Sequence, residues 1–207
     1  CPACNPEGCT WFADSGCTSG SLSATDYTTT GTWDYATMSL FPTIQCSADG
    51  VLQIVTSHPL AADGKTRLSF LIRERVDFGL ITNTTIKVYL DASSAYLELV
   101  GEFHFFDEFW RARLYVGGVQ YGTTVWVAGQ SPQFEMCWDG TTVSASGYDG
   151  TWHHVGEGPA TIVTIAPKLD VSRIPVGSVM RFGSLLAAKL PDDITGCTDC
   201  QTADCTY

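Results

Sequence analysis

The residues at 110–116 alternate strictly between apolar and other side chains, and Gly117 and Gly118 follow them directly. The even positions hold Trp, Ala, Leu and Val, whereas the odd positions hold Arg, Arg and Tyr. A period of two places successive side chains on opposite faces of a β-strand, and a Gly-Gly pair is typical of a tight hairpin turn. This segment therefore predicts a half-buried strand that turns back into an antiparallel neighbour.

Similar strand signals recur along most of the chain, separated by Gly, Pro or Asp-Gly, and no segment shows a convincing helical period. We expect about ten to twelve strands at intervals of roughly 8–15 residues, a pattern typical of two packed antiparallel sheets. The fold class predicted is all-β, an antiparallel two-sheet sandwich. The other segments with strand signals are 31–40, 51–55, 68–76, 84–90, 119–121, 134–138, 141–146, 162–165 and 178–186.

Composition supports one folded domain and excludes two classes of partner. The chain has 207 residues, 44% of them hydrophobic, with 22 Asp and Glu against 11 Lys and Arg. A β-sandwich of this length commonly forms one unit, and phosphate binding needs a basic stripe that this acidic chain lacks. We therefore expect no nucleic-acid partner. No apolar run approaches the roughly 18 residues of a membrane helix, so we expect no membrane span.

Seven of the nine cysteines gather at the two ends of the chain, four within the first seventeen residues and three within the last eleven. Disulfides contribute most where hydrophobic burial is thin, so this distribution predicts cross-linked ends on a self-sufficient core, in an oxidising compartment. Eight cysteines are the expected disulfide residues, and their pairing is left open among 105 possibilities. They are Cys1, Cys4, Cys9, Cys17, Cys46, Cys197, Cys200 and Cys205.

Cys137 is the ninth cysteine, and nine is an odd number, so at least one thiol is free or joined to another chain. It lies in the strand-like run 134–138, where a buried and inert free thiol is expected. The two Cys-x-x-Cys pairs, at 1–4 and 197–200, also have the spacing of a zinc knuckle. Further cysteines beside each pair favour disulfides over zinc.

The segment 134–150 reads Phe-Glu-Met-Cys-Trp-Asp-Gly-Thr-Thr-Val-Ser-Ala-Ser-Gly-Tyr-Asp-Gly, with an Asp-Gly after each of two strand-like runs. It resembles the hairpin of concanavalin A-like lectin/glucanase domains of the laminin-G type. The tracts 96–118 and 178–185 are similar to the middle strands and the last strand of those jelly-roll sandwiches. The resemblance implies a jelly roll over 27–190, with adjacent ends that bring the two cysteine clusters together. A cysteine-rich arm at 1–26 and a cysteine-rich tail at 191–207 would flank it.

The chain lacks the sequence motifs of the catalytic sites that we considered. Glycosidases of the family that the chain resembles carry two glutamates and an aspartate at alternate positions of one strand. This chain has no such motif. Glu98 and Glu102 share a strand face but lie about 13 Å apart at 3.3 Å per residue, too far for a catalytic carboxylate pair unless the strand bulges. His153 and His154 are adjacent and point to opposite faces of a strand, so they form no chelating pair. A Gly-x-Ser-x-Gly nucleophile elbow is also missing.

Two kinds of binding residue are candidates. Calcium is the cofactor considered first, because the resembling sandwiches bind it through Asp side chains and loop carbonyls, although Asp-Gly in a hairpin is usually only a turn. The candidate ligands are Asp139, Asp149, Asp192 and Asp193. The candidate aromatic platforms for stacking on sugars are Trp126, Trp152, Tyr121 and Tyr148.

These observations favour an extracellular, non-catalytic structural or adhesive module of lectin-like fold, as a component of a cell surface, filament or virion surface. It would assemble with copies of itself or with other surface proteins, in part through its terminal cysteines. A carbohydrate-binding lectin is the first alternative, with glycans as partners, and predicts an exposed aromatic beside polar groups. A glycoside hydrolase or lyase is the second, and predicts two carboxylates about 5–9 Å apart in a cleft.

Overall fold

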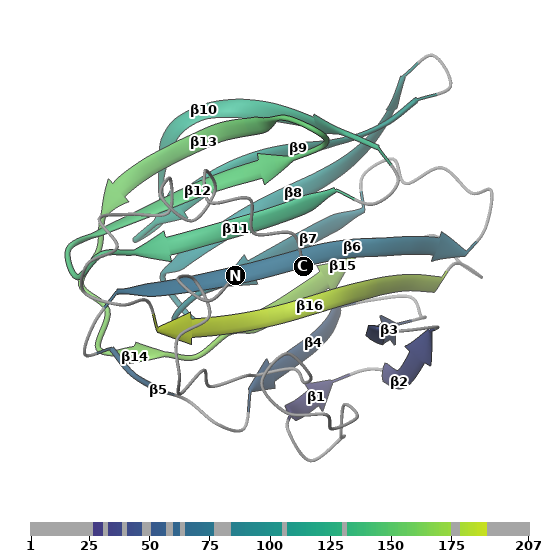
Figure 1. The fold of residues 1–207 in the computed structure, drawn as a ribbon, viewed down its shortest axis with the longest axis horizontal. Helices are drawn as coiled ribbons and strands as arrows, with labels where there is room; N and C mark the ends of the chain where they lie inside the picture. The colour runs from purple at the N-terminus through teal and green to yellow at the C-terminus, as the bar shows by residue number, and fades with distance from the viewer. Residues whose placement is uncertain are drawn as a thin grey trace.

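The computed structural model describes residues 27–30, 33–38, 41–46, 51–56, 60–62, 65–76, 84–104, 107–129, 132–174 and 179–189, and the statements below concern these residues. They form sixteen strands and no helix, arranged mainly in two sheets of seven strands each (Figure 1). All strand pairs are antiparallel. The predicted two-sheet sandwich is confirmed. The described part contains no helix long and apolar enough to cross a membrane.

Sheet A contains the strictly alternating segment 110–116, which lies in one of its seven strands. In spatial order it consists of β1 (Tyr27–Thr30), β4 (Val51–Thr56), β15 (Lys168–Ser172), β7 (Thr85–Tyr89), β8 (Ala95–His104), β9 (Asp107–Val116) and β10 (Val119–Ala128).

Sheet B contains the segment that carries the family resemblance. In spatial order it consists of β13 (Trp152–Pro159), β12 (Thr142–Tyr148), β11 (Gln133–Trp138), β6 (Thr66–Val76), β16 (Val179–Lys189), β3 (Phe41–Cys46) and β2 (Trp33–Met38). A third, two-stranded sheet pairs β5 (Leu60–Ala61) with β14 (Thr164–Ile165).

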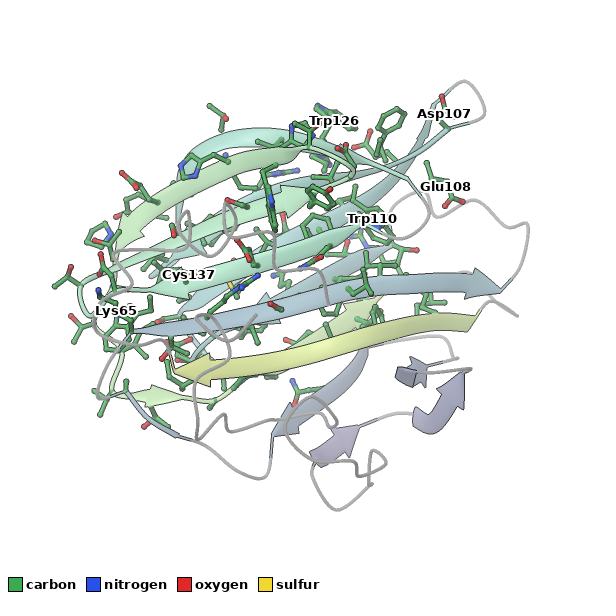
Figure 2. The ribbon with its side chains drawn as sticks, viewed as in Figure 1. Lys65, Asp107, Glu108, Trp110, Trp126 and Cys137 are labelled. Atoms are coloured by element: carbon green, nitrogen blue, oxygen red, sulfur yellow. The ribbon has the colours of Figure 1, made fainter. Side chains whose placement is uncertain are left out.

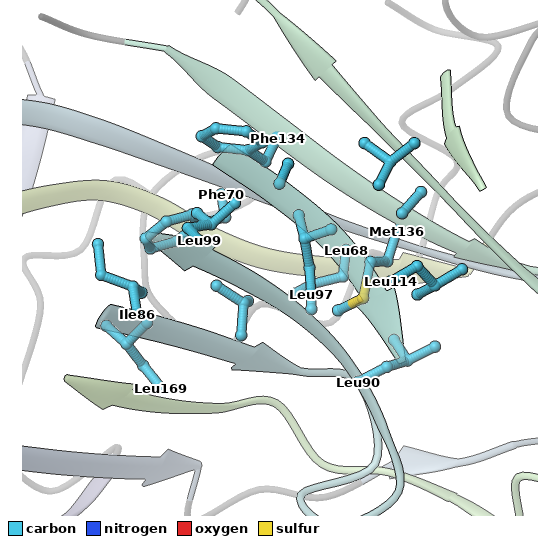
Figure 3. Close-up of a cluster of buried hydrophobic side chains, with 14 of the residues drawn as sticks. Leu68, Phe70, Ile86, Leu90, Leu97, Leu99, Leu114, Phe134, Met136 and Leu169 are labelled. Atoms are coloured by element: carbon cyan, nitrogen blue, oxygen red, sulfur yellow. The ribbon is translucent and has the colours of Figure 1, made fainter. Parts of the chain in front are cut away.

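The core lies between the inner faces of the two sheets, where alternate residues of each strand meet (Figure 3). Phe70 and Phe134 from sheet B and Leu97 and Leu99 from sheet A are among its most buried side chains. The period of two decides this division, because the intervening residues of each strand face away from the partner sheet. Each sheet therefore has an outer face, and these two faces differ in character.

The hairpin predicted after residue 116 is confirmed. Gly117 and Gly118 connect β9 to β10, and both have positive φ angles, of 58° and 81°. Such angles at both central residues suit the two-residue turn whose twist matches that of antiparallel strands, and glycine adopts them without a steric cost.

Candidate functional site

Three rows of side chains cross the outer face of sheet A, because the register of its strands aligns outward residues of neighbouring strands. We call them the tyrosine row, the charged row and the tryptophan row. The tyrosine row comprises Lys168, Tyr89, Tyr96 and Tyr115; the charged row comprises Gln53, Asp170, Lys87, Glu98 and Arg113; and the tryptophan row comprises Val100, Arg111 and Trp126.

The tyrosine row is a stack of rings that stand side by side. The ring centroids of Tyr96 and Tyr115 are 5.1 Å apart with nearly parallel planes, and those of Tyr89 and Tyr96 are 4.9 Å apart. The Lys168 ammonium lies 3.9 Å from the centroid of Tyr89, and that of Lys87 lies 5.0 Å from the centroid of Tyr96. Neighbours thus occupy the ring faces of Tyr89 and Tyr96, and the edges and hydroxyls of these two rings are the groups available to a ligand.

The tyrosine hydroxyls keep their protons well above neutral pH. Burial, followed by the nearby Asp170 carboxylate, raises the pKa of Tyr89 to about 12. Burial and the charge of Glu98 also raise the pKa of Tyr96. Both hydroxyls therefore donate and accept hydrogen bonds at neutral pH, and a raised pKa makes them poor general bases.

The charged row alternates in sign across four strands. Lys87 Nζ lies 4.0 Å from Glu98 Oε2, and Arg113 Nη1 lies 3.8 Å from Glu98 Oε1. Asp170 accepts a 2.8 Å hydrogen bond from Gln53 Nε2 and lies 3.1 Å from Lys168 Nζ. Partly exposed ion pairs of this kind add only about 0–1 kcal/mol each to stability, so their main effect is to hold polar groups in fixed positions.

The tryptophan row ends at the most exposed aromatic side chain of the described structure. Trp126, on the edge strand β10, is 44% exposed and lies near the upper edge of the molecule in Figure 2. The Arg111 guanidinium lies 6.0 Å from its ring centroid, and the Phe109 ring meets it edge-on at 6.4 Å. Arg111 Nη1 also forms a 3.1 Å ion pair with Glu102 Oε1. An indole is thus presented beside a positioned cation and anion.

The two carboxylates weighed for catalysis remain separate. The pairing of β8 with β9 runs without a bulge from Ala95 to His104, so Glu98 and Glu102 keep the spacing of a regular strand. Each carboxylate also contacts an arginine, Arg113 and Arg111 respectively. Within the outer face of sheet A, these two glutamates do not form the carboxylate pair of a glycosidase.

The other predicted sugar platforms do not gather around Trp126. The Tyr121 ring packs where a Cβ on Gly158 would stand, at the contact between β10 and β13. Tyr148 and Trp152 are paired residues at the end of sheet B, with ring centroids 5.0 Å apart, and Tyr148 is 37% exposed. Trp126 and the Tyr148–Trp152 pair are therefore two separate exposed aromatic sites.

Two of the calcium candidates serve as turn residues. The Asp139 carboxylate accepts hydrogen bonds from the backbone amides of Thr141 and Thr142, at 2.8 and 2.7 Å. The Asp149 carboxylate accepts a 2.9 Å hydrogen bond from the Ala128 amide and pairs with His153 Nε2 at 2.9 Å. Among the described residues, no three potential metal ligands gather in one place. Calcium stays a prediction, since Asp192 and Asp193 lie outside the described residues.

His153 and His154 occupy different surroundings, as their adjacency predicted. His153 pairs in register with Gly147 and contacts Asp149, whereas His154 pairs with Ser146 and is exposed. The two rings do not form a joint site with a third ligand in the described structure.

Cys137 is disulfide-bonded, which corrects the expectation of a free thiol. It is 6% exposed, as expected for its strand-like run, and is labelled in Figure 2. Local sequence could not separate the two states, because a thiol and a disulfide sulfur are buried equally well in a strand. The terminal cysteines, with their proposed disulfide or zinc roles, lie outside the described residues, as do the arms at 1–26 and 191–207; the side chain of Cys46 does so as well.

Sequence reasoning missed the tyrosine row. The signal was present, because Tyr89, Tyr96 and Tyr115 each occupy an outward position in an alternating strand. Only the register of β7, β8 and β9 places the three rings in one line, and register depends on pairing between strands that no single strand specifies.

No protein-family model and no curated protein sequence matches the chain. Among solved structures it is similar to a sialidase, with a TM-score of 0.52 and 11% identity over 92% of this chain and 19% of that one. It is similar to a GH43 glycoside hydrolase (TM-score 0.50, 9% identity, 84% and 42% covered). It is also similar to a structure from work on cell entry of botulinum neurotoxin type C (TM-score 0.50, 8% identity, 88% and 48% covered).

This chain spans less than half the length of each of these proteins, and identities near 10% indicate a shared fold alone. The fold is a concanavalin A-like jelly-roll sandwich, as the resemblance of residues 134–150 implied. Two of these structures are a sialidase and a GH43 glycoside hydrolase, and a shared fold does not by itself decide what this chain does.

Proposed function

We propose that the chain is an extracellular, non-catalytic adhesive module of lectin-like fold that binds carbohydrate on the outer face of sheet A. The observation that carries this proposal is the exposed indole of Trp126 beside the Arg111–Glu102 ion pair. Small-ligand sites combine an apolar or aromatic surface with a few positioned polar groups. Here the indole supplies a face on which a sugar ring stacks, and the charged side chains supply hydrogen bonds to its hydroxyls.

The rows beside Trp126 extend this surface across the sheet. Glu98 and Arg113 hold each other in place, and the hydroxyls of Tyr96 and Tyr115 lie in the neighbouring row. Successive rows are about 6.6 Å apart, because outward residues alternate along a strand with a rise of 3.3 Å. A glycan of several units would meet several rows at once, which favours an extended chain over a single sugar.

The outer face of sheet A is better suited to binding a glycan than to hydrolysing it. A hydrolase needs two carboxyl groups about 5–9 Å apart on either side of the scissile bond. Glu98 and Glu102 are four positions apart in a regular strand, and each contacts an arginine. Their geometry suits recognition of hydroxyl groups.

The disulfide bond of Cys137 supports an extracellular location, because disulfides persist in oxidising compartments. A cell surface, a filament or a virion surface would each suit an adhesive module. Assembly through the terminal cysteines belongs to the same proposal. Intact mass with and without reduction tests it, since covalent multimers that separate on reduction are expected, and a monomer in both conditions contradicts assembly.

A glycan array followed by calorimetry tests carbohydrate binding. The wild-type chain should retain at least one glycan on the array, and W126A should bind that glycan at least about tenfold more weakly, or about 1.4 kcal/mol. Y148A is the matched control, because it removes an exposed aromatic from the other sheet, and it should bind as the wild type does. Unchanged binding by W126A, or cleavage of the retained glycan, contradicts the proposal.

A further inference from the structure

The outer face of sheet A carries an excess of positive side chains, although the whole chain is acidic. The chain holds 22 Asp and Glu against 11 Lys and Arg, a formal net charge of −11. On the three rows, the described cations are Lys87, Arg111, Arg113 and Lys168, and the described carboxylates are Glu98 and Asp170. Glu102, beside the tryptophan row, adds a third carboxylate, which leaves one positive charge in excess.

Carboxylates elsewhere on the chain act weakly at this face. At an ionic strength of about 0.15 M, charges are screened over about 8 Å. Asp107, the next outward acid along β9, is four positions from Arg111, or about 13 Å of strand. A ligand on the three rows therefore responds mainly to the charges of the rows themselves.

Arg113 is the cation of these rows whose charge is least satisfied by its neighbours. Its Nη1 lies 3.8 Å from Glu98 Oε1, beyond the roughly 2.7–3.2 Å of an N–H···O hydrogen bond. Its Nε is buried and has no hydrogen-bond partner among the described residues. Glu98 is also shared with Lys87, whose Nζ lies 4.0 Å from the other carboxylate oxygen. Two cations thus share one carboxylate, and neither is within hydrogen-bond distance of it.

The β10 side of Arg113 presents no acidic side chain in the described structure. The register of β10 with β9 shifts between Tyr121 and Val125, so Arg113 has no aligned partner on β10. Residues 122–124, which form this irregularity, are Gly, Thr and Thr, and all three are exposed. Glu157, on the adjoining strand β13, lies between two glycines that face β10, so its side chain points away. An anionic group therefore approaches Arg113 from this side without meeting a carboxylate.

We propose that the glycan bound on this face is acidic, and that Arg113 binds its carboxylate or sulfate group. This inference rests on the proposed function, because Trp126 supplies the contact with the sugar ring. Trp126 is one strand and one row away from Arg113, or about 8 Å at a strand spacing of about 4.8 Å and a row spacing of about 6.6 Å. A sugar stacked on the indole, or the unit next to it, therefore brings its charged group to the guanidinium.

The charged neighbours of Arg113 divide the work of binding. The planar guanidinium of an arginine forms two parallel hydrogen bonds with an oxyanion such as a carboxylate. Arg111 is already held by Glu102 at 3.1 Å and lies against Trp126, so it positions the indole. Glu98 repels an incoming anion, but the two cations that flank it offset its charge. A neutral glycan adds no partner to Arg113, so the acidic form should bind more tightly.

Two pairs of probes, each an acidic oligosaccharide with an uncharged counterpart, test the proposal on the wild-type chain. They are oligogalacturonate with its methyl ester, and sulfated cello-oligosaccharide with its unsulfated parent. By calorimetry, at least one acidic member should bind about tenfold or more tightly than its counterpart, because charge-assisted hydrogen bonds are the stronger ones. Added salt should weaken that binding and leave any binding of the counterpart unchanged. The pair that responds shows whether the group is a carboxylate or a sulfate.

Substitutions separate the arginine from the indole. R113Q should weaken binding of the acidic probe about tenfold or more, to the level of its uncharged counterpart. K65Q is the matched control, because it also removes one positive charge, but Lys65 precedes β6 of sheet B and lies far from Trp126 (Figure 2). This control should bind both members as the wild type does. W126A should weaken binding of both members, because it removes the ring contact.

The outcomes distinguish failure of this inference from failure of the proposed function. Counterparts that bind as tightly as their acids, or an R113Q variant that binds the acidic probe as the wild type does, overturn the acidic assignment. The proposed function survives those results, provided that W126A still weakens binding. Binding of neither pair overturns the assignment as well, and an array that also retains no glycan overturns the proposed function with it.

Discussion

Gly122 in β10 and Gly156 in β13 lie in backbone contact where the edges of the two sheets meet. A Cβ on Gly156 would overlap the carbonyl oxygen of Tyr121, and a Cβ on Gly122 would overlap that of Val155. The sandwich therefore closes along one edge through a contact that only glycine permits. Trp126 lies on the same strand as Gly122, so this closure also positions the proposed platform.

Substitution of Gly156 by alanine should destabilise the fold by about 1–3 kcal/mol, because the added methyl group has no space. G117A is the comparison: Gly117 has a φ of 58° but nothing within 4 Å of its Cβ position, so only the backbone cost of about 1 kcal/mol applies. Urea unfolding of both variants measures the difference. A smaller loss for G156A than for G117A contradicts the role of the close contact.

Arg67 and Glu135 form a buried ion pair, with 2.7 Å between Arg67 Nη2 and Glu135 Oε2. Glu135→Gln should cost about 3–5 kcal/mol, because it leaves the Arg67 guanidinium buried beside an uncharged partner. Replacement of both residues, as R67M/E135L, should recover much of this loss, since two apolar side chains of similar size need no desolvation of charge. Chemical denaturation of the three proteins measures the cycle. A double variant that is no more stable than E135Q would refute a buried ion pair at this position.

Asp91 caps the turn between β7 and β8, and it should make the free energy of unfolding depend on pH in the acidic range. Its Oδ1 accepts hydrogen bonds from the amides of Ser93, Ser94 and Ala95, at 3.0, 2.8 and 3.0 Å. Burial raises the pKa of Asp91, but the hydrogen bonds from Ser94, Ala95 and Ser93 together lower it further, to below its ordinary value of 3.8. The resulting stability is present above pH 3.8 and is lost as the pH falls toward the lowered pKa.

Stability measured at several pH values tests this cap. D91N should be less stable than the wild type at neutral pH, and the difference should shrink as the pH falls below 3.8. D107N is the control for loss of one acidic charge, because Asp107 is exposed at the start of β9. An equal difference between D91N and the wild type at all pH values would speak against the charged cap.

Tyr89 should titrate well above the ordinary pKa of a tyrosine. Its pKa is raised from 10.0 to about 12, so its contribution to stability is complete below pH 10 and is lost as the pH rises toward 12. Ultraviolet titration of the native chain should reveal a tyrosine that ionises near pH 12, and Y89F should remove that step. Persistence of the step in Y89F would assign it to another residue.

Strands were predictable where apolar and polar side chains alternate. They were harder to predict where close packing requires glycine or where few residues are apolar. The alternation at 110–116 correctly predicted which side chains of β9 are buried, and Gly117-Gly118 predicted the hairpin that follows. Strand β13 (Trp152–Pro159) was missed because Gly156 and Gly158 weaken its strand signal. Both positions require glycine because a Cβ there would overlap atoms of β10. Strand β15 (Lys168–Ser172) was missed because it holds only two apolar residues, Leu169 and Val171, although it joins β4 to β7 within sheet A.

The candidate site was only partly predictable for the same reason. Trp126 could be selected as a candidate because it is out of phase with Val125 and Val127. The structure leaves its side chain 44% exposed, and sugar binding by this residue stays a prediction. Its partner Arg111 lies on another strand, and their contact depends on the β9–β10 register. The disulfide of Cys137 could not be predicted either, because pairing is a property of the folded chain.

Chemical-shift mapping by NMR tests the central claim most directly, with the glycan that the array retains as the titrant. The account predicts shifts in the Trp126 indole and in the amides of β8, β9 and β10, with the amides of β11 and β12 unchanged. Shifts centred on the Tyr148–Trp152 pair, or no shift at saturating glycan, would contradict carbohydrate binding on the outer face of sheet A.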